Sequence, residues 1–360
     1  MNDSSLEKLR EEISERDREI LRLLNERAAI SILIGKLKEA HGKDMFDPAR
    51  ERLIIDRLME IHEGPLRENA VREIFREILS ASRNLQSPLT VAYLGPEGTF
   101  SHLAVLSRFG SGEKLIPVSM ISQVFDEVEK GKADLGMVPV ENSMEGSVKH
   151  TLDRLISTTL QIRGEVFLRV SHSLMSLCHE LDEIMRIYSH PQAIAQCRGW
   201  LRQYVPRAAL LETTSTTDAV EKALHDPCSA AIGSRVASSA YGLPIIKEGI
   251  EDEPSNMTRF LILGKGSCDR SGVDKTSLVF STPHTPGGLY RSLEPFATAL
   301  INMTRIESYP VRGKVWEYLF FVDFNGHRDD DVVNKCLADM KERTTYMKVL
   351  GSYPKGEEPA

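Results

Sequence analysis

Residues 6–40 read LEKLREEISERDREILRLLNERAAISILIGKLKEA. Apolar residues recur there every three or four positions, as in one long amphipathic helix: Leu6, Leu9, Ile13, Ile20, Leu24, Ile34 and Leu37. Arg27 lies one heptad after Ile20 and one heptad before Ile34, and Lys38 lies two heptads after Leu24. Both cations therefore face the apolar side, where an unpaired charge is costly to desolvate. A buried anion, either a protein carboxylate or a ligand, is expected with them.

The spacing of these cations limits what they can bind. Arg27 and Lys38 lie about 16 Å apart along a helix axis on nearly the same face, so their long side chains can bracket one small dianion. Arg10 lies about 25 Å from Arg27 on the same helix and can reach that ligand only from another chain, which predicts an intertwined dimer. The alternative, surface charges with packed stems and solvated heads, holds for most single arginines on helices.

Two further helices are predicted after Gly42. Pro48 suits a first helical position with Asp47 as its cap, and Arg50 and Glu51 lie at the same helix start. The third helix is expected over residues 66–85. Because the first helix is far too long to pack on itself, the three helices predict an all-α module that needs a partner chain.

Residues 1–88 resemble the helical chorismate mutase domain of the bifunctional chorismate mutase/prephenate dehydratase family. The matching strings are LREEIS, LLNERAA, IGKLK, FDPARER and SASRNLQ. The resemblance implies that Arg10 of the partner subunit and Arg27 bind a substrate carboxylate, and that Lys38 and Gln86 face the ether oxygen of chorismate. It implies that the rest of the pocket is lined by Asp47, Arg50, Glu51 and Ser82. The rearrangement to prephenate is a one-step pericyclic shift, so no metal or cofactor is expected.

Composition limits the class of protein. The 360 residues are 41% hydrophobic and 27% charged, as in multidomain soluble proteins, and the net charge of −7 argues against a nucleic-acid partner. Five widely spaced cysteines without a CxxC motif predict neither disulfides nor a zinc site. No segment resembles a signal peptide or approaches the roughly 20 apolar residues of a membrane span, so a cytoplasmic location without a membrane partner is expected.

Residues 89–267 alternate short apolar strands with helical stretches, which predicts an α/β fold with largely parallel sheets. Polar clusters follow several strands, where ligands bind in such sheets. Each cluster alone is as well explained by a turn or a helix cap. Four in one domain favour an anion pocket, with hydroxyls and an amide from Thr99, Ser101, Asn142, Ser143, Ser147 and Ser215.

The same segment resembles the prephenate dehydratase domain through GPEGTFSHLA, PVENSMEGSV, YSHPQAIAQC, STTDAV, AAIGS and NMTRFLIL. The resemblance implies two α/β lobes, as in a periplasmic binding protein, with the site in the cleft. It assigns catalysis to Thr258, Arg259 and Phe260, and other pocket positions to Glu141, Asn142, Ser189 and Gln196. Thr258 is expected to help hydroxide leave prephenate as a donor, and Arg259 to fix a carboxylate. His172, His190 and His284 are expected to make local hydrogen bonds without holding a metal.

Residues 275–353 follow the order βαββαβ, which predicts a ferredoxin-like α+β domain. This segment resembles the ACT regulatory domain, which in this family binds phenylalanine between paired domains. The resemblance assigns effector binding to Gly287, Gly288, Leu289, Glu307 and Ser308. Tyr309 departs from the family pattern, which has Arg at that position. The alternative is a dimerisation domain that has lost its effector. The C-terminal tail from Tyr353 is expected to fray.

The sequence therefore predicts a bifunctional, feedback-inhibited enzyme that converts chorismate to prephenate and prephenate to phenylpyruvate. One alternative is an enzyme that uses arogenate at its second site. The other is an amino-acid-sensing binding protein, since both later folds also occur in binders.

Overall fold

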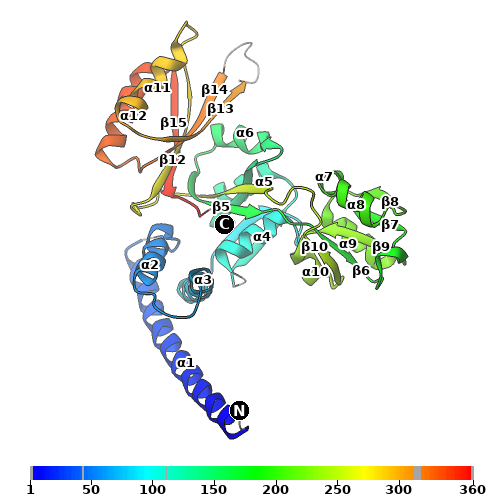
Figure 1. Cartoon of the computed structure of the whole chain (residues 1–360). Coiled ribbons are helices and arrows are strands. Elements are labelled where there is room, and N and C mark those ends of the chain that lie inside the picture. The colour runs from blue at the N-terminus through cyan, green and yellow to red at the C-terminus, as the bar shows by residue number, and fades with distance from the viewer. Residues whose placement is uncertain (1–2, 43, 111, 311–317, 358–360) are drawn as a thin grey trace. The chain divides into compact units, whose positions relative to one another are not determined.

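The structure, a computed structural model, describes residues 3–42, 44–110, 112–310 and 318–357 (Figure 1). The chain divides into two units. The helical unit consists of Met1–Leu89 and Phe109–Lys114, and the α/β unit consists of Thr90–Arg108 and Leu115–Ala360.

The helical unit contains the three predicted helices, α1 (Asp3–Ala40), α2 (Pro48–Glu60) and α3 (Glu68–Gln86). The predicted start of α2 is confirmed, because Asp47 caps the helix and accepts a hydrogen bond from the backbone of Arg50. Helix α3 packs closely on α1 over small residues. Ser31 is buried, and a Cβ atom added to Gly35 would lie 2.9 Å from the Cβ atom of Gln86.

The apolar side of α1 is exposed within the single chain. Ile20 is 54% exposed, Leu24 37% and Ile34 43%, although these residues were expected to form a buried seam. The two shorter helices leave most of the 38-residue helix uncovered. The expected burial is therefore not provided by the helical unit of the same chain.

The first lobe of the α/β unit is a sheet with the order β2-β1-β3-β11-β5, and β4 pairs with β3. Its strands are β1 (Thr90–Leu94), β2 (Lys114–Val118), β3 (Leu135–Asn142), β4 (Gly146–Ser147), β5 (Gln161–Arg169) and β11 (Met257–Gly264). Its helices are α4 (Phe100–Phe109), α5 (Ile121–Glu129) and α6 (Lys149–Ser157).

The second lobe is a sheet with the order β10-β6-β9-β7-β8. Its strands are β6 (Ser173–Ser176), β7 (Arg186–Ser189), β8 (Ala209–Glu212), β9 (Ser229–Gly233) and β10 (Ile245–Glu248). Its helices are the short 3-10 helix η1 (Leu181–Glu183), α7 (Pro191–Gln196), α8 (Arg198–Tyr204), α9 (Thr216–His225) and α10 (Arg235–Tyr241). The two-lobed α/β arrangement is as predicted.

Both lobes have mixed sheets, so the expectation of largely parallel sheets is wrong. Strands β1 and β3 are parallel, but β11 runs antiparallel to both β3 and β5. In the second lobe, β6 is antiparallel to β9 and β10. The chain passes to the second lobe after β5 and returns through β11. Because β11 enters its sheet from the other lobe, it needs no helical crossover and is free to run antiparallel.

The third sheet has the order β13-β14-β12-β15 and confirms the predicted ferredoxin-like fold. Its strands are β12 (Asp274–Ser281), β13 (Met303–Pro310), β14 (Tyr318–Asn325) and β15 (Tyr346–Pro354), and its helices are α11 (Gly288–Thr298) and α12 (Asp331–Arg343). We call these elements, residues 274–354, the C-terminal domain. One hydrophobic cluster joins it to the first lobe, with Leu261 and Leu263 packed in the same core as Phe321 and Leu350.

The chain end does not fray at Tyr353, contrary to expectation. Tyr353 is completely buried within β15, and Gly356 donates its backbone N–H to Glu165 at 2.9 Å. The prediction failed because it was based on the polar composition of the tail, whereas Tyr353 at its start packs in the core. Residues 358–360 lie outside the described part of the chain.

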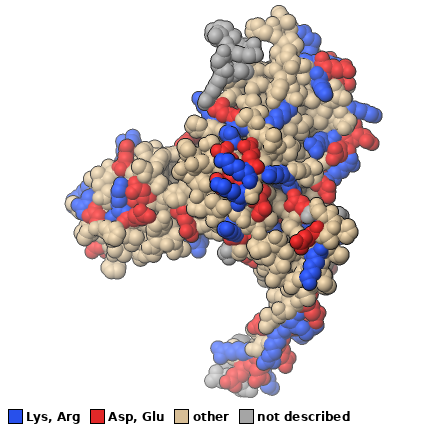
Figure 2. Space-filling model, turned by 180° about the vertical axis from the view of Figure 1, so that it is seen from behind, with Lys and Arg blue, Asp and Glu red and all other residues tan. Residues whose placement is uncertain are grey.

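Surface charge is mixed in sign. Figure 2 shows Lys and Arg side chains interspersed with Asp and Glu over the visible face. Within the described residues, no helix has the length and apolar character needed to span a bilayer.

Candidate active sites

The α/β unit contains a cavity of about 320 Å³ lined by residues of both lobes. Among the predicted residues, the cavity is lined by Thr99, Ser101, Asn142, Gln196, Thr258 and Phe260, together with Ser215 from the polar clusters. It is also lined by residues for which no binding role was predicted, including Phe100, His172, His190, Gln192, Thr214 and Thr216.

The polar wall of this cavity is built from helix starts. Thr99 precedes α4 and accepts a hydrogen bond from the backbone of His102 at 3.3 Å. Ser215 caps α9 by accepting a hydrogen bond from the backbone of Asp218 at 3.0 Å. The described lining residues include no Lys or Arg. A carboxylate in this cavity would therefore be held by hydroxyls and by the positive ends of helices.

Thr258 and Asn142 lie side by side on paired strands. They are partners in the β11–β3 register, and the Asn142 Nδ2 atom donates to the Thr258 Oγ1 atom at 2.8 Å. The Asn142 Oδ1 atom accepts the backbone N–H groups of Met144 and Glu145 at 3.0 and 3.1 Å, which fixes the orientation of the amide. Because the Thr258 oxygen accepts from Asn142, its own proton remains available to donate into the cavity.

His172 is the main cavity residue that sequence reasoning missed. It is buried, and its Nε2 atom lies 2.8 Å from the Oε1 atom of Gln196. With that amide oxygen as acceptor, Nε2 carries the proton and Nδ1 is a buried acceptor without a hydrogen-bond partner among the described residues. Burial lowers the pKa of His172, against smaller raising effects from the Gln196 hydrogen bond and the Glu251 charge.

Five residues predicted for the dehydratase pocket lie outside the cavity lining: Glu141, Ser143, Ser147, Ser189 and Arg259. The Ser189 hydroxyl donates to the backbone of Ile232, and the Ser143 hydroxyl accepts the backbone N–H of Met257. Glu141 pairs with Arg305 of the C-terminal domain.

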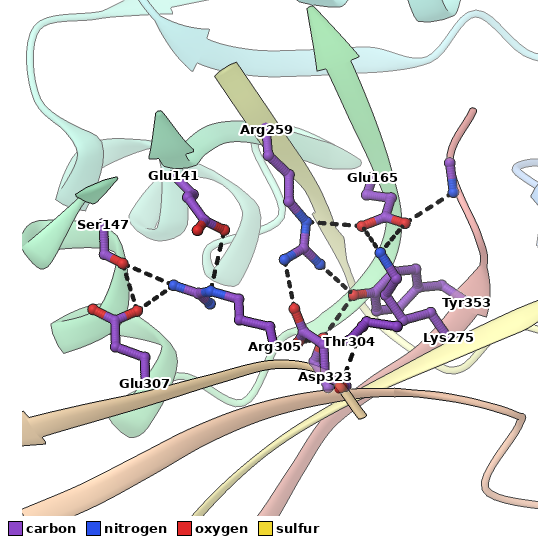
Figure 3. A network of polar contacts seen from close by, with 12 residues as sticks. Glu141, Ser147, Glu165, Arg259, Lys275, Thr304, Arg305, Glu307, Asp323 and Tyr353 are labelled. Atoms are coloured by element: carbon purple, nitrogen blue, oxygen red, sulfur yellow. Dashed lines mark hydrogen bonds and ion pairs between the residues drawn. The ribbon is translucent and has the colours of Figure 1, made fainter. Parts of the chain in front are cut away.

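Arg259 was expected to fix a substrate carboxylate, but its guanidinium is enclosed by Glu165, Asp323 and Tyr353 (Figure 3). Successive side chains of a strand point to opposite faces. Arg259 therefore turns away from the cavity that its neighbours Thr258 and Phe260 line.

In the helical unit, four predicted residues gather on the face where α1 meets α3. Arg27 donates to the hydroxyl of Ser82, Gln86 packs on Gly35, and the Lys38 Nζ atom lies 3.4 Å from the carbonyl oxygen of Met45. Among the described residues, neither cation is paired with a carboxylate. Both are half-buried, and burial lowers the pKa of Arg27.

The other predicted mutase residues have different surroundings. Asp47 is the cap of α2, and Arg50 and Arg10 are exposed within the chain. Glu51 forms an ion pair with Arg83, a buried arginine that sequence reasoning missed although it lies in the matching string SASRNLQ. Arg83 also bonds Glu113 at 3.0 Å, so the carboxylate of Glu51 is already engaged by the protein.

The predicted effector residues of the C-terminal domain are divided between two places. Gly287 and Gly288 start α11. Gly287 has a φ of +75°, and a Cβ atom on Gly288 would clash with the carbonyl oxygen of Pro283. Leu289 packs beside the core under this helix. Glu307 instead bonds Arg305 and Ser147 of the first lobe, and Ser308 is exposed.

The described residues include no group of three His, Cys, Asp or Glu side chains arranged to hold a metal ion. None of the five cysteines, all within the described residues, forms a disulfide.

Comparisons with known proteins cover nearly the whole chain. The family described as "Chorismate mutase type II" matches residues 9–87, and the family "Prephenate dehydratase" matches residues 91–268. A bifunctional chorismate mutase/prephenate dehydratase of Aquifex aeolicus is 43% identical over 97% of this chain and 98% of its own length. The protein of that name from Neisseria gonorrhoeae is 42% identical over 94% of both chains.

Among solved structures, the prephenate dehydratase of Arthrobacter aurescens in complex with L-Phe is 34% identical with a TM-score of 0.68. The match covers 74% of this chain and 90% of that one. The order of a helical unit followed by a two-lobed α/β unit agrees with the order of the two matched families. The chain belongs to the bifunctional chorismate mutase/prephenate dehydratase family.

Proposed function

We propose that the chain catalyses two consecutive reactions, the rearrangement of chorismate to prephenate in the helical unit and the conversion of prephenate to phenylpyruvate in the α/β unit. The observation that carries the second assignment is the Thr258–Asn142 pair at the cavity, which leaves a hydroxyl proton available to a substrate. Family membership over nearly the full length supports both activities.

The mutase mechanism that we propose needs charge and shape but no titrating group. Arg27 supplies a planar fork for a carboxylate, while Lys38 and Gln86 donate to the ether oxygen as negative charge develops there. Holding the dianion in its compact conformer removes most of the entropic part of the barrier. The unpaired state of both cations among the described residues supports an external anion as their partner.

For this site we propose a dimer in which Arg10 of the partner subunit completes the pocket. Support comes from α1, whose apolar side is exposed in the single chain. Contiguous exposed apolar surface of this kind marks an interaction site. A second copy of α1 offers the matching surface, as symmetric interfaces require.

For the dehydratase step we propose that Thr258 donates a hydrogen bond to the 4-hydroxyl group of prephenate. The ring carboxylate leaves as CO₂, its bonding electrons complete the aromatic ring, and the 4-hydroxyl leaves as hydroxide, which takes a proton from the solvent to become water. An unactivated Thr is a poor acid, so its contribution is positioning and hydrogen bonding. The carboxylates are met by the starts of α4 and α9, which is consistent with a lining that contains no cation among its described residues.

We further propose that phenylalanine inhibits the dehydratase through the C-terminal domain. The solved relative from Arthrobacter aurescens contains L-Phe, which supports this assignment. Gly287, Gly288, Leu289 and Ser308 remain the proposed contacts. Glu307 is occupied by Arg305 and Ser147, so its proposed part is to hold that junction.

A coupled assay tests the proposed function. The purified chain is given chorismate, and phenylpyruvate is followed before and after phenylalanine is added. We expect phenylpyruvate to form without another enzyme and to form more slowly with phenylalanine. Accumulation of prephenate without phenylpyruvate would contradict the dehydratase assignment, and turnover only with arogenate would assign the second site to that substrate.

We expect the dehydratase kcat/KM to fall only at pH values lower than the ordinary histidine pKa of about 6.5, because burial lowers the pKa of His172 and protonation then removes the acceptor at its Nδ1 atom. The folded-state pKa of His172 lies below its ordinary value, so the imidazole is neutral at pH 7. The unfolded chain takes up the proton at a higher pH than the folded chain, so folding stability is also lost as pH falls through this range.

The pH profiles of two variants test this expectation. His172→Asn should lower kcat/KM and remove the acidic limb. His284→Asn, at an exposed position, should keep both the rate and the limb. An unchanged acidic limb in His172→Asn would assign it to another group.

A further inference from the structure

A buried ionic network joins the C-terminal domain to the strand that carries Thr258 (Figure 3). The Arg259 guanidinium donates to Glu165 at 2.8 Å through Nε, to Asp323 through Nη1 and to the Tyr353 hydroxyl at 3.0 Å through Nη2. Glu165 also bonds Lys275 at 2.7 Å. Arg259 and Glu165 belong to the first lobe, whereas the other three residues belong to the C-terminal domain.

The network is closed and balanced in charge. Arg259 and Lys275 offset Glu165 and Asp323, and each of the four residues is at most 7% exposed. Burial disfavours the ionised form of Asp323, yet the charge of Arg259 holds the pKa of this carboxyl below its ordinary value. Ser277 donates to Asp323 and is hydrogen-bonded to Tyr353 at 2.6 Å. Removing one of the four charged members therefore leaves a buried charge without its partner.

The strand register connects this network to the cavity. Thr258 pairs with Asn142, and the next pair is Arg259 with Glu141. Thr258 and Asn142 line the cavity, whereas Arg259 and Glu141 bond the C-terminal domain, the latter through Arg305 at 3.1 Å. The register shifts between Arg259 and Phe260, and irregularities of this kind re-aim side chains beside active sites. The two paired residues that line the cavity thus each adjoin a residue held by the C-terminal domain.

We propose that Asp323 and Tyr353 are positioning residues for the dehydratase reaction, acting through Arg259 to keep Thr258 and Asn142 in place at the cavity. The inference rests on the proposed dehydratase function. Arg259 has no contact with the cavity, so it serves catalysis through the backbone of β11. The C-terminal domain is then part of the catalytic framework even without an effector.

The test uses the full chain and the variants Asp323→Asn and Tyr353→Phe. Steady-state kinetics with prephenate give kcat and KM, and mutase turnover of the same preparation reports an intact helical unit. The matched control is Thr276→Val, which removes a buried hydroxyl from β12 that bonds Gly326 and Ser352 outside the network. Thermal unfolding of each variant records the loss of stability.

We expect kcat to fall about 10- to 100-fold in Asp323→Asn, because small displacements of a catalytic group have effects of this size. Tyr353→Phe should lower kcat less, since the ion pairs remain. KM should change less than about threefold in both, because no substrate contact is lost. Thr276→Val should keep the wild-type kcat, even if its unfolding temperature is lower.

Two outcomes would overturn the inference. Wild-type kcat in both network variants would show that the junction does not position Thr258. A raised KM with unchanged kcat would show that Arg259 acts in substrate binding. If Asp323→Asn does not fold, Tyr353→Phe decides by the same criteria. Failure of the wild-type chain to convert prephenate would instead overturn the proposed function and this inference with it.

Discussion

Replacing Thr258 with Ala should lower the dehydratase kcat by about 100-fold or more and leave mutase turnover unchanged. The substitution removes the hydroxyl of the Thr258–Asn142 pair, which donates the proposed hydrogen bond to the departing hydroxyl, while leaving the strand backbone intact. The two activities are measured separately, with prephenate and with chorismate, on one preparation. Thr258→Ser is the matched control, because it keeps the hydroxyl and should keep most of the activity.

The contrast between the two activities makes this prediction specific. Thr258 is buried in the α/β unit, and the mutase residues belong to the helical unit. A parallel loss of both activities would mean that the sites are not independent. Full dehydratase activity in Thr258→Ala would show that this hydroxyl takes no part in the reaction.

Replacing Arg27 with Ala should lower the mutase kcat/KM by about 100- to 1,000-fold and leave the dehydratase unchanged. The guanidinium is half-buried and lies on the face where α1 meets α3, and its hydrogen-bond partner among the described residues is the neutral hydroxyl of Ser82. The substitution therefore removes a positive charge that has no carboxylate partner among the described residues and is available to a bound anion. The measurement is the initial rate of chorismate loss over a range of chorismate concentrations.

Arg22→Ala is the control for this variant. Arg22 lies five residues earlier on the same helix, and its exposed side chain forms an ion pair with Glu26 at 2.6 Å. Exposed pairs of this kind contribute little to stability, so the control should keep nearly full mutase activity. Equal losses of mutase activity in the two variants would show that any substitution in α1 is harmful. They would contradict a specific role for Arg27 in substrate binding.

Local chemistry explains why the helices could be predicted. Asp47 and Pro48 form a cap whose signal lies within adjacent residues, and the apolar repeat of α1 needs no knowledge of its partner. The predicted burial of that repeat is not found within one chain, since the described residues of the helical unit leave it exposed. Intervals along the chain define an amphipathic side but not the element that covers it.

The dehydratase site was only partly accessible to sequence reasoning. Strand alternation already places Thr258 and Arg259 on opposite faces, and this argument could have separated their roles. What the sequence could not supply was the partner of Arg259, because Asp323 and Tyr353 are far away along the chain. His172 was missed for a related reason. Its signal is burial beside a cavity, which arises only when the two lobes meet.

Tyr309 illustrates a departure from the family pattern that packing explains. The side chain is buried next to Phe321, and its hydroxyl donates to Asp153 of α6 at 2.6 Å. Arg305, Glu307 and Tyr309 alternate along β13, and each contacts the first lobe, so this part of β13 serves the junction between the domains.

The central claim, that Arg27 of one chain and Arg10 of another share one substrate, is tested by mixing two inactive proteins. Arg10→Ala and Arg27→Ala chains are unfolded together and refolded, and chorismate turnover is compared with that of each variant treated alone. Half of the randomly formed dimers contain one intact site, so we predict recovery of about a quarter of the wild-type mutase activity. No recovery, or an Arg10→Ala protein that is fully active by itself, would contradict a site built from two chains.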